Sequence, residues 1–399
     1  MNILFVTPDY PKRGQPTTGF PNYLYRVSLA LVQMGHKPII LSAGTWDDHR
    51  IEEGIEIWIV GINSYPNSCF QALKYALHAL KVGYYLNLKI KEVAEKIQLD
   101  VIQFTSLYGV ALLYRGKTPA VLRLSSYAKT AFASYQTYSF VTVKIMSFFE
   151  KTSSYRCKVI FSPCKNNAEA FSKDCKRKVK VIETPFVNDV QEYDNTFVDI
   201  HLNEKKYVLF FGTLYIEKGI LVIAEILEQF LNMNQDYYFV FIGDACNING
   251  ENAANILQRR AGKCSNRIII SKALPHKLLY PVIREADFVV LPSLMENLSN
   301  ACIEAMYHEK VVIGTNGASF EQLITHGQNG LLCKIGDSQD LFEKMQSVVT
   351  MSVNQKIRIG KLAKQRIDKL KPECVVKKLV QLYEYVIIKD NCNRKENIK

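Results

Sequence analysis

The sequence has no uninterrupted apolar run near 20 residues, although 48% of its 399 residues are hydrophobic. A membrane-spanning helix is not expected, because crossing a bilayer takes about 20 predominantly apolar residues. The first residues, MNILFVTPDY, lack the charged region, long apolar region and cleavage site of a secretory signal. They are typical of a buried strand, so we expect a cytoplasmic protein. Internal repeats and low-complexity tracts are also missing.

Paired cysteines are missing as well. The ten cysteines form no Cys-x-x-Cys pairs and no His/Cys cluster with zinc spacing. Reduced, mostly buried thiols are therefore expected, rather than disulfides or metal ligands. The acidic pair Asp47 and Asp48 lacks the strand-end setting of a metal site. No metal ion is expected.

The net charge of +12 is concentrated in the first half of the chain. Residues 1–190 carry 24 Lys and Arg against 14 Asp and Glu, and residues 81–180 carry 18 against 6. This excess predicts an anionic partner, such as a membrane surface, a lipid-linked phosphate or an acidic polymer. The alternative is a basic surface that only meets solvent. Nucleic acid is not an expected partner, because no binding motif accompanies the charge.

Several aromatic residues fall among these basic ones. Aromatic and basic side chains on a helix are typical of an interfacial membrane contact, but an ordinary core helix also contains such aromatics. The residues are Phe132, Tyr135, Tyr138, Phe140, Phe148 and Phe149.

Strand and helix patterns alternate along the whole chain, which predicts an α/β fold with parallel sheets covered on both faces. Two domains are expected, since the chain exceeds one ordinary core. Strands are predicted at 2–7, 38–42, 55–60, 100–104, 119–124, 158–162, 207–212, 238–243, 267–271, 288–291 and 311–314, with first-half helices near 21–34, 70–97 and 134–155. The predicted divisions are a domain at 1–190, a polar linker at 191–206, a domain at 207–371, and a last helix with a frayed tail at 372–399. Two Rossmann-like domains facing each other across a cleft would place the active site in that cleft.

Residues 287–308, DFVVLPSLMENLSNACIEAMYH, predict a buried strand, a loop and a helix. Asn297 or Ser299 can cap the first amides of the helix. Glu296 precedes this cap, and Glu304 follows eight residues later. With helical geometry the two carboxylates would lie roughly 12 Å apart, about the length of a nucleoside diphosphate sugar from sugar to ribose. Carboxylates accept hydrogen bonds from hydroxyls, whereas helix amides favour a phosphate. Alternatively, Glu296 is an ordinary loop residue and Glu304 a solvated charge.

A second motif, FFGTLYIEKGI, predicts a strand that ends at Gly212, a loop, and a helix opened by Lys218 and Gly219. Lys218 would place a cation on a diphosphate, with helix amides in support. A solvated surface lysine is the alternative. In the first half, Gly19 opens a helix after the first strand, where glycine lets the backbone approach a substrate, unless it is a plain turn residue. Arg123 and Ser125 follow another strand and are expected to face the cleft.

Together these residues resemble a known family. LPSLMENLSNACIEAM, followed by Gly317, Glu321 and HGQNGLL, is similar to the donor signature of the family 4 retaining glycosyltransferases (glycosyltransferase group 1), which have the GT-B fold. The resemblance covers most of the chain and is strongest from 207 to 340. It implies that Glu304 binds ribose hydroxyls and that Glu296 holds the donor sugar near its reacting carbon. Amides around Leu298 and Ser299 would add contacts.

The resemblance also implies that 1–190 binds the acceptor, that 207–371 binds the nucleotide sugar, and that the last helix crosses back to the first domain. This sequence departs from the family pattern at three places. A Gly-Gly pair is reduced to Gly19, the arginine expected after Gly212 is Thr213, and a histidine is replaced by Ser125. Arg123 or Lys129 could replace the missing cation.

The function implied is retaining, metal-independent transfer of a sugar from a UDP- or GDP-sugar, which is a substrate rather than a cofactor. A glycan or lipid-linked acceptor is expected, in the synthesis of surface polysaccharide or lipid-linked oligosaccharide. Peripheral contact with an anionic membrane, at the inner face of the cell membrane, would explain the basic first half. The alternatives are an epimerase or hydrolase of the same fold, and a non-catalytic scaffold with a decayed donor site, which Thr213 and Ser125 suggest.

Overall fold

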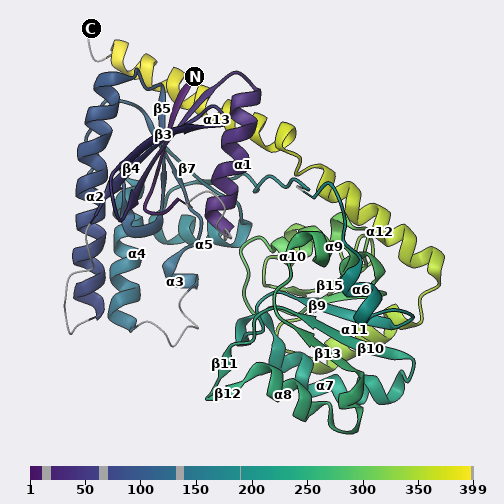
Figure 1. Ribbon diagram of the computed structural model, residues 1–399. Coiled ribbons are helices and arrows are strands. Elements are labelled where there is room, and N and C mark those ends of the chain that lie inside the picture. The colour runs from purple at the N-terminus through teal and green to yellow at the C-terminus, as the bar shows by residue number, and fades with distance from the viewer. Residues whose placement is uncertain (11–18, 63–70, 132–138, 189, 397–399) are drawn as a thin grey trace. The chain divides into compact units, whose positions relative to one another are not determined.

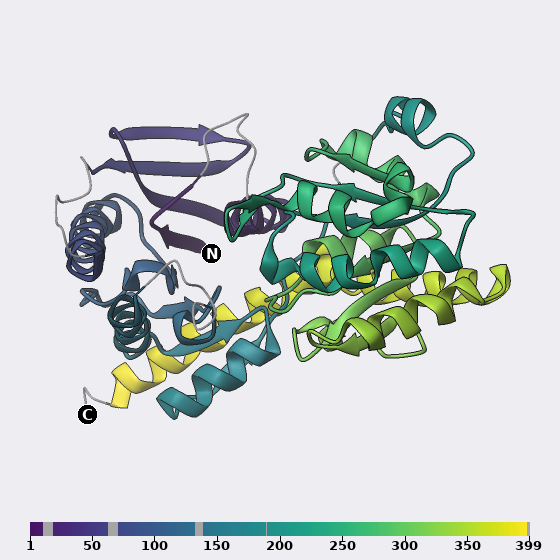
Figure 2. The same cartoon turned by 90° about the horizontal axis from the view of Figure 1, so that it is seen from below.

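The computed structural model describes residues 1–10, 19–62, 71–131, 139–188 and 190–396. The chain forms two compact units. The first combines Met1–Val187 with Lys371–Lys399, and the second is Asn188–Leu370. Each unit is a sheet covered by helices, seen from two sides in Figures 1 and 2. The predicted α/β class with parallel sheets is confirmed.

The first unit is built on an eight-stranded sheet in the order β3-β4-β2-β1-β5-β6-β7-β8. All its strand pairs are parallel except β3 with β4. The strands are β1 (Asn2–Thr7), β2 (Lys37–Gly44), β3 (Asp48–Glu52), β4 (Ile55–Gly61), β5 (Val101–Thr105), β6 (Ala120–Arg123), β7 (Val159–Ser162) and β8 (Val179–Val181). The chain leaves β1 toward β2 on one side and later returns to β5 on the other. The carboxyl ends of β1 and β5 therefore form a topological switch point, where open α/β sheets bind ligands.

The helices of the first unit cover this sheet. They are α1 (Gly19–Gln33), α2 (Gln71–Lys96), α3 (Ala128–Ala131), α4 (Phe140–Ser154), α5 (Lys165–Cys175) and α13 (Pro372–Glu396), with a 3-10 turn η1 (Leu107–Gly109) after β5. The long α2 lies beside α4 (Figure 1). The last helix, α13, packs against α1, and the Tyr383 hydroxyl donates a buried hydrogen bond to Gln103 Oε1 at 2.6 Å. The C-terminal residues thus complete the first core.

The second unit contains a six-stranded, all-parallel sheet in the order β13-β10-β9-β14-β15-β16. Its strands are β9 (Lys206–Phe211), β10 (Tyr237–Ile242), β13 (Ile268–Ser271), β14 (Phe288–Leu291), β15 (Val312–Asn316) and β16 (Leu331–Lys334), with a small hairpin of β11 (Asn247–Ile248) and β12 (Glu251–Asn252). Both faces are buried, so the strands are near-continuous apolar runs. The strand order reverses between β9 and β14, which places a second switch point at their carboxyl ends.

The helices of the second unit flank its sheet. They are α6 (Thr196–His201), α7 (Ile220–Met233), α8 (Ala253–Arg260), α9 (His276–Glu285), α10 (Asn300–Tyr307), α11 (Ser338–Val349) and α12 (Val353–Asp368), with 3-10 turns η2 (Ile216–Lys218), η3 (Gly262–Arg267) and η4 (Phe320–Gln322). Within the described residues, no helix has both the length and the apolar character needed to span a membrane.

The segment 191–206, predicted as a linker, is part of the second unit in the structure. It contains α6, which packs against α9. The Asp194 amide donates to the Lys277 carbonyl at 3.0 Å, and the side chain of Leu202 is 2% exposed. One buried leucine in a polar stretch is too weak a pattern for the sequence to show this packing.

Candidate functional site

Lys218 and Glu296 come together at the switch point of the second unit. Lys218 ends η2, in the loop after β9, and Glu296 lies in the loop after the neighbouring strand β14. Their side chains form an ion pair. The Ser293 hydroxyl also donates to Glu296 Oε1, at 3.3 Å. The carboxylate is the more buried partner, with 14% of its side chain exposed against 36% for Lys218, so solvent reaches the ammonium more easily.

These two loops are docked on each other by backbone contacts. Gly219 has a φ of 77°, and a Cβ at this position would lie 2.0 Å from the Pro292 carbonyl oxygen. Only glycine permits both this conformation and this approach. The Leu294 amide also donates to the Glu217 carbonyl at 2.8 Å. The position of Lys218 beside Glu296 is therefore fixed by the backbone as well as by charge.

Helix α10 begins beside this pair. The Ser299 hydroxyl caps it by accepting a hydrogen bond from the Cys302 amide at 3.3 Å, so Ser299 rather than Asn297 is the N-cap. Because α10 starts at Asn300, Glu296 lies outside the helix, so helical geometry does not connect it to Glu304, and the separation of roughly 12 Å stays a prediction. The loop that follows Pro292 extends to the cap and interrupts the helical geometry.

Glu304 lies in the second turn of α10, with 13% of its side chain exposed. His276 Nε2 lies 3.8 Å from Glu304 Oε1, and the imidazole stacks on the Tyr280 ring with a centroid distance of 5.0 Å. No motif in the sequence indicated His276. Its only signal was its position at the start of the helix after β13.

The other predicted contacts of the second unit lie in the same two loops, after β9 and after β14. Gly212 follows β9 with a φ of 126°, and nothing lies within 4 Å of the position of an added Cβ. Thr213 is exposed, while Asn297 and Leu298 are half-buried in the loop before α10. In contrast, Glu321 Oε2 accepts a hydrogen bond from the Gly317 amide at 3.2 Å, which stabilises the turn after β15.

Of the predicted site residues of the first unit, Arg123, Ser125 and Lys129 have partners within that unit. Gly19 is the first residue of α1, and the loop that precedes it lies outside the described residues. The Arg123 guanidinium is 3.7 Å from the centroid of the Tyr23 ring and donates to Ser125 Oγ at 2.5 Å. Arg123 is 4% exposed, and burial lowers its pKa. Contact of Arg123 or Ser125 with a donor stays a prediction, and Lys129 pairs with Asp174 at 2.8 Å.

Comparison with known proteins adds the family. Residues 194–366 match the family described as glycosyl transferases group 1. The 2-deoxystreptamine N-acetyl-D-glucosaminyltransferase of Niallia circulans is 26% identical over 180 residues, which are 45% of this chain and 45% of that protein. The match thus covers less than two thirds of that relative.

Two further comparisons extend over nearly the whole chain. An uncharacterized glycosyltransferase of Methanocaldococcus jannaschii is 21% identical over 402 aligned positions, covering 96% of this chain and 98% of that protein. The solved structure of sucrose-phosphate synthase from Thermosynechococcus elongatus superimposes with a TM-score of 0.74 at 17% identity, covering 97% and 99% of the two chains. At that identity the superposition establishes the fold alone. The chain therefore has the GT-B fold, and its residues 194–366 match the family of glycosyl transferases group 1.

Proposed function

We propose that this protein is a retaining glycosyltransferase that moves a sugar from a UDP- or GDP-sugar to a glycan or lipid-linked acceptor. The observation that carries the proposal is the Lys218–Glu296 pair at the switch point, with Glu304 on the next helix. Ligands of open α/β sheets bind outside the carboxyl ends of the strands at such a point. A cation, two carboxylates and helix amides suit the diphosphate and hydroxyls of one sugar nucleotide.

Each group has a distinct role in this proposal. Lys218 and the amides at the start of α10 stabilise the negative charge of the diphosphate as it leaves. The diphosphate competes with Glu296 for Lys218, which frees the carboxylate to accept hydrogen bonds from sugar hydroxyls. Glu304 accepts hydrogen bonds from the ribose, and His276 orients it from 3.8 Å.

The reaction follows from the family resemblance. The bond from the anomeric carbon to the diphosphate breaks, and the acceptor oxygen bonds to the same face of that carbon. The acceptor proton passes to the departing phosphate oxygen, which gives a glycoside and a nucleoside diphosphate. Cationic side chains and amides provide the neutralisation, so the proposed reaction uses neither a metal ion nor a cofactor.

Nucleotide protection tests this proposal. UDP, GDP and ADP are compared for their shift of the thermal unfolding temperature, because a ligand that binds the folded state stabilises it by mass action. We expect UDP or GDP to protect the wild type. Glu304→Ala should weaken the binding of that nucleotide by about 1–3 kcal/mol, which is the cost of leaving polar groups unpaired. Glu343→Ala, on an exposed position of α11, is the matched control.

The alternatives give other outcomes. A scaffold with a decayed site would bind neither UDP nor GDP. A hydrolase or epimerase would convert the sugar nucleotide without any acceptor, which mass spectrometry of the products detects. Unchanged affinity in Glu304→Ala would remove its ribose role.

Membrane contact is the second part of the proposal, and it rests on the neighbouring helices α2 and α4. Exposed apolar side chains recur with helical spacing along α2, at Leu73, Leu77, Leu80, Tyr84 and Leu88. A second stripe on and just after α4 consists of Val141, Phe148 and Tyr155. Exposed apolar stripes on two neighbouring helices mark an interaction surface.

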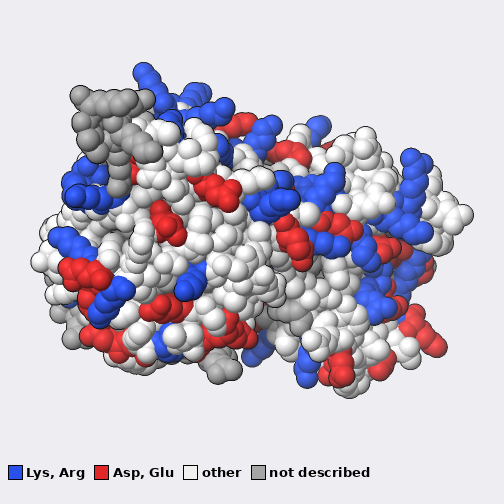
Figure 3. Space-filling model, turned by 90° about the horizontal axis from the view of Figure 1, so that it is seen from above, with Lys and Arg blue, Asp and Glu red and all other residues white. Residues whose placement is uncertain are grey.

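Charge supports an anionic lipid surface as the partner. Lys144 Nζ lies 4.3 Å from the ring centroid of the exposed Phe140, and Lys74 and Lys81 lie on α2. Aromatic and apolar side chains enter the headgroup region while lysines meet anionic lipid. On the face in Figure 3, basic side chains are interspersed with acidic ones, so the positive excess forms no continuous patch there. We propose that the α2–α4 surface docks at the inner face of the cell membrane, where surface polysaccharide or lipid-linked oligosaccharide is assembled.

A further inference from the structure

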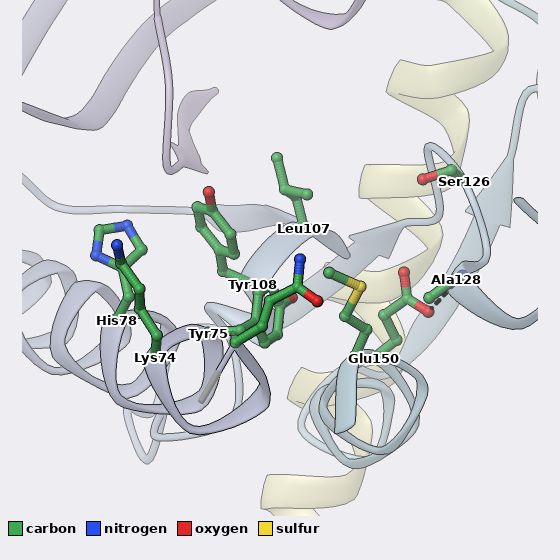
Figure 4. A pocket seen from close by; sticks show the side chains of 10 residues that line it. Lys74, Tyr75, His78, Leu107, Tyr108, Ser126, Ala128 and Glu150 are labelled. Carbon is green, nitrogen blue, oxygen red and sulfur yellow. Dashed lines mark hydrogen bonds between the residues drawn. The ribbon is translucent and has the colours of Figure 1, made fainter. Parts of the chain in front are cut away.

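The first unit contains a cavity of about 240 Å³, and of its lining residues only Lys74 has a role in the proposals above. Its walls come from α2, η1, the segment between β6 and α3, the start of α3, and α4 (Figure 4). The lining residues are Gln71, Lys74, Tyr75, His78, Leu107, Tyr108, Ser126, Ala128, Met146 and Glu150. Leu107 and Ser126 follow the carboxyl ends of β5 and β6, which is the edge where such sheets bind ligands.

One wall is an aromatic surface held by an unusual turn. Tyr108 has a φ of 56°, a conformation that non-glycine residues rarely adopt and that surrounding structure must enforce. The next residue, Gly109, packs so closely on α4 that an added Cβ would lie 2.8 Å from Phe149 Cβ. The Tyr108 ring therefore has a defined position, 5.6 Å from the Tyr75 centroid and 5.3 Å from that of His78.

Glu150 places a carboxyl group at the inner end of the cavity. The residue is only 6% exposed, and its Oε2 accepts a hydrogen bond from the Ala128 amide at 2.9 Å. Its other oxygen points into the cavity (Figure 4). Burial raises the pKa of Glu150 to about 8, so at neutral pH the group is mostly protonated and can donate a hydrogen bond.

These features select a class of ligand. Pockets for drug-sized molecules measure roughly 300–1,000 Å³, so this smaller cavity suits a single ring. Tyrosine faces favour a ring with an apolar side, and a buried neutral carboxyl favours an uncharged oxygen over a fixed charge. A hydroxylated ring of hexose size meets all three conditions.

We propose that this cavity binds one neutral hydroxylated ring, with a ring or hydroxyl oxygen accepting a hydrogen bond from Glu150. That this ring is the terminal residue of the acceptor rests on the proposed function. The ring-binding site itself does not, because it depends only on the first unit.

A titration with phenyl β-D-glucopyranoside, followed by ligand-observed NMR at neutral pH, tests the site. Tyr75→Ala should raise the dissociation constant on the order of fivefold, the loss expected for one aromatic contact. Glu150→Leu should raise it to a similar extent, whereas Glu150→Gln, which keeps an N–H donor, should stay close to the wild type. Tyr85→Ala, at an exposed position of α2 outside the cavity, and Glu169→Gln, at an exposed position of α5, are the matched controls.

Charged probes test the ligand class. Phenyl β-D-glucuronide and D-glucosamine should both bind more weakly than the neutral glucoside. Tighter binding of glucosamine, lost in Glu150→Gln, would show an ionised carboxylate and overturn the assignment. Equal glucoside affinity in the wild type and in Tyr75→Ala would also overturn the assignment of the ring to this cavity.

A parallel measurement separates this inference from the proposed function. All four cavity and control variants on α2 and α4, Tyr75→Ala, Tyr85→Ala, Glu150→Leu and Glu150→Gln, should keep the thermal protection given by UDP or GDP. If neither UDP nor GDP raises the unfolding temperature of the wild type, the proposed function is overturned, but the assignment of the ring-binding cavity is not. If UDP or GDP still protects the protein, and both Tyr75→Ala and Glu150→Leu bind the glucoside like the wild type, only the assignment of ring binding to the cavity is overturned.

Discussion

Lys218 provides the cationic side chain that stabilises the leaving diphosphate in the proposed donor site. Lys218→Ala should reduce turnover on the order of a hundredfold, like the loss of other groups that stabilise developing charge. Nucleotide affinity should fall less, because Glu304 and the helix amides remain. The checks are the rate of nucleoside diphosphate release, with the donor selected by the protection experiment, and the shift in unfolding temperature with that nucleotide.

A folding defect can be distinguished from this catalytic effect. Partly exposed ion pairs contribute about 0–1 kcal/mol to stability, so Lys218→Ala should unfold near the wild-type temperature. Lys361→Ala, at an exposed position of α12, is the matched control and should keep full turnover. Equal turnover in the two variants would reject the role of Lys218.

Glu150 predicts a specific dependence of stability on pH. Its pKa is raised from 4.5 to about 8 by burial, so between these values the folded state holds a proton that the unfolded state has lost. The contribution of this group is complete below pH 4.5 and is lost as the pH rises through about 8. The slope in that window is about 1.4 kcal/mol per pH unit.

Glu150→Gln should therefore flatten the stability curve between these pH values, since the amide does not titrate. Urea unfolding at several pH values measures the slope, and Glu169→Gln, whose side chain is 67% exposed, is the control. A wild-type slope in Glu150→Gln would mean that Glu150 is ionised in the folded protein.

The residues of the second unit were easier to predict than those of the first. Lys218 and Glu296 follow apolar strands, and the loops after parallel strands of one sheet lie at the same edge of that sheet. His276 and Glu150 were missed because their roles come from packing: one approaches Glu304 from another helix, and the other is buried against Ala128. No local pattern in the sequence records such contacts.

At the scale of elements, buried parallel strands were predicted within two residues, whereas the two edge strands of the first sheet, β3 and β8, were missed. β1 was predicted in full as 2–7, because strands buried on both faces are continuous apolar runs. The missed β3 reads DHRIE, an antiparallel strand with polar residues, and β8 has only three residues. Of the aromatics in the basic region, Phe140 and Phe148 are exposed and Phe149 is buried, while Phe132, Tyr135 and Tyr138 lie outside the described residues.

The junction of η2 and α7 gives a prediction for an element. Gly219 and Gly327 have nearly equal φ values, 77° and 75°, but only Gly219 approaches other backbone closely. Both Gly→Ala variants carry the strain of a positive φ, on the order of 1–2 kcal/mol. Gly219→Ala must also move the Pro292 carbonyl, so we expect a further loss of about 1–3 kcal/mol, as for other overpacked sites.

Denaturant unfolding of both variants isolates the effect of the close approach, because Gly327 has nothing within 4 Å of the added Cβ. The shift of the unfolding temperature by UDP or GDP should become smaller in Gly219→Ala and stay unchanged in Gly327→Ala, since only Gly219→Ala displaces the loop that carries Lys218. Equal stability of the two variants would show that the loops after β9 and β14 are not docked on each other.

For the whole molecule, the sequence predicts two sheets and the structure has them, but the division of the chain is less simple. Contacts assign 188–206 to the second unit, and 371–399 to the first. The polar stretch 191–206, with Leu202 as its one buried leucine, has the composition of a linker, and only the structure shows what it packs against. The same limit applies to surfaces: the stripe on α2 follows from helical spacing, but its exposure could not be deduced from the sequence.

That exposure leads to a prediction for the intact protein at a membrane. The wild type should sediment with vesicles of phosphatidylcholine containing about one third phosphatidylglycerol, and less with phosphatidylcholine alone, since lysines contribute about 1 kcal/mol each near an anionic surface. The variant Leu77→Glu with Phe148→Glu places a carboxylate in each stripe of the α2–α4 surface. It should bind on the order of tenfold more weakly, because apolar insertion is lost and acidic headgroups repel the new charges.

The control variant, Ile200→Glu with Val353→Glu, changes two exposed apolar residues of the second unit and adds the same charge. It should sediment like the wild type, which separates loss of the surface from a change in net charge. Raising the salt concentration should weaken binding but not abolish it, since screening acts on the lysines and not on apolar burial. If both double variants sediment equally, the α2–α4 surface is not the membrane contact, and the exposed stripes need another partner.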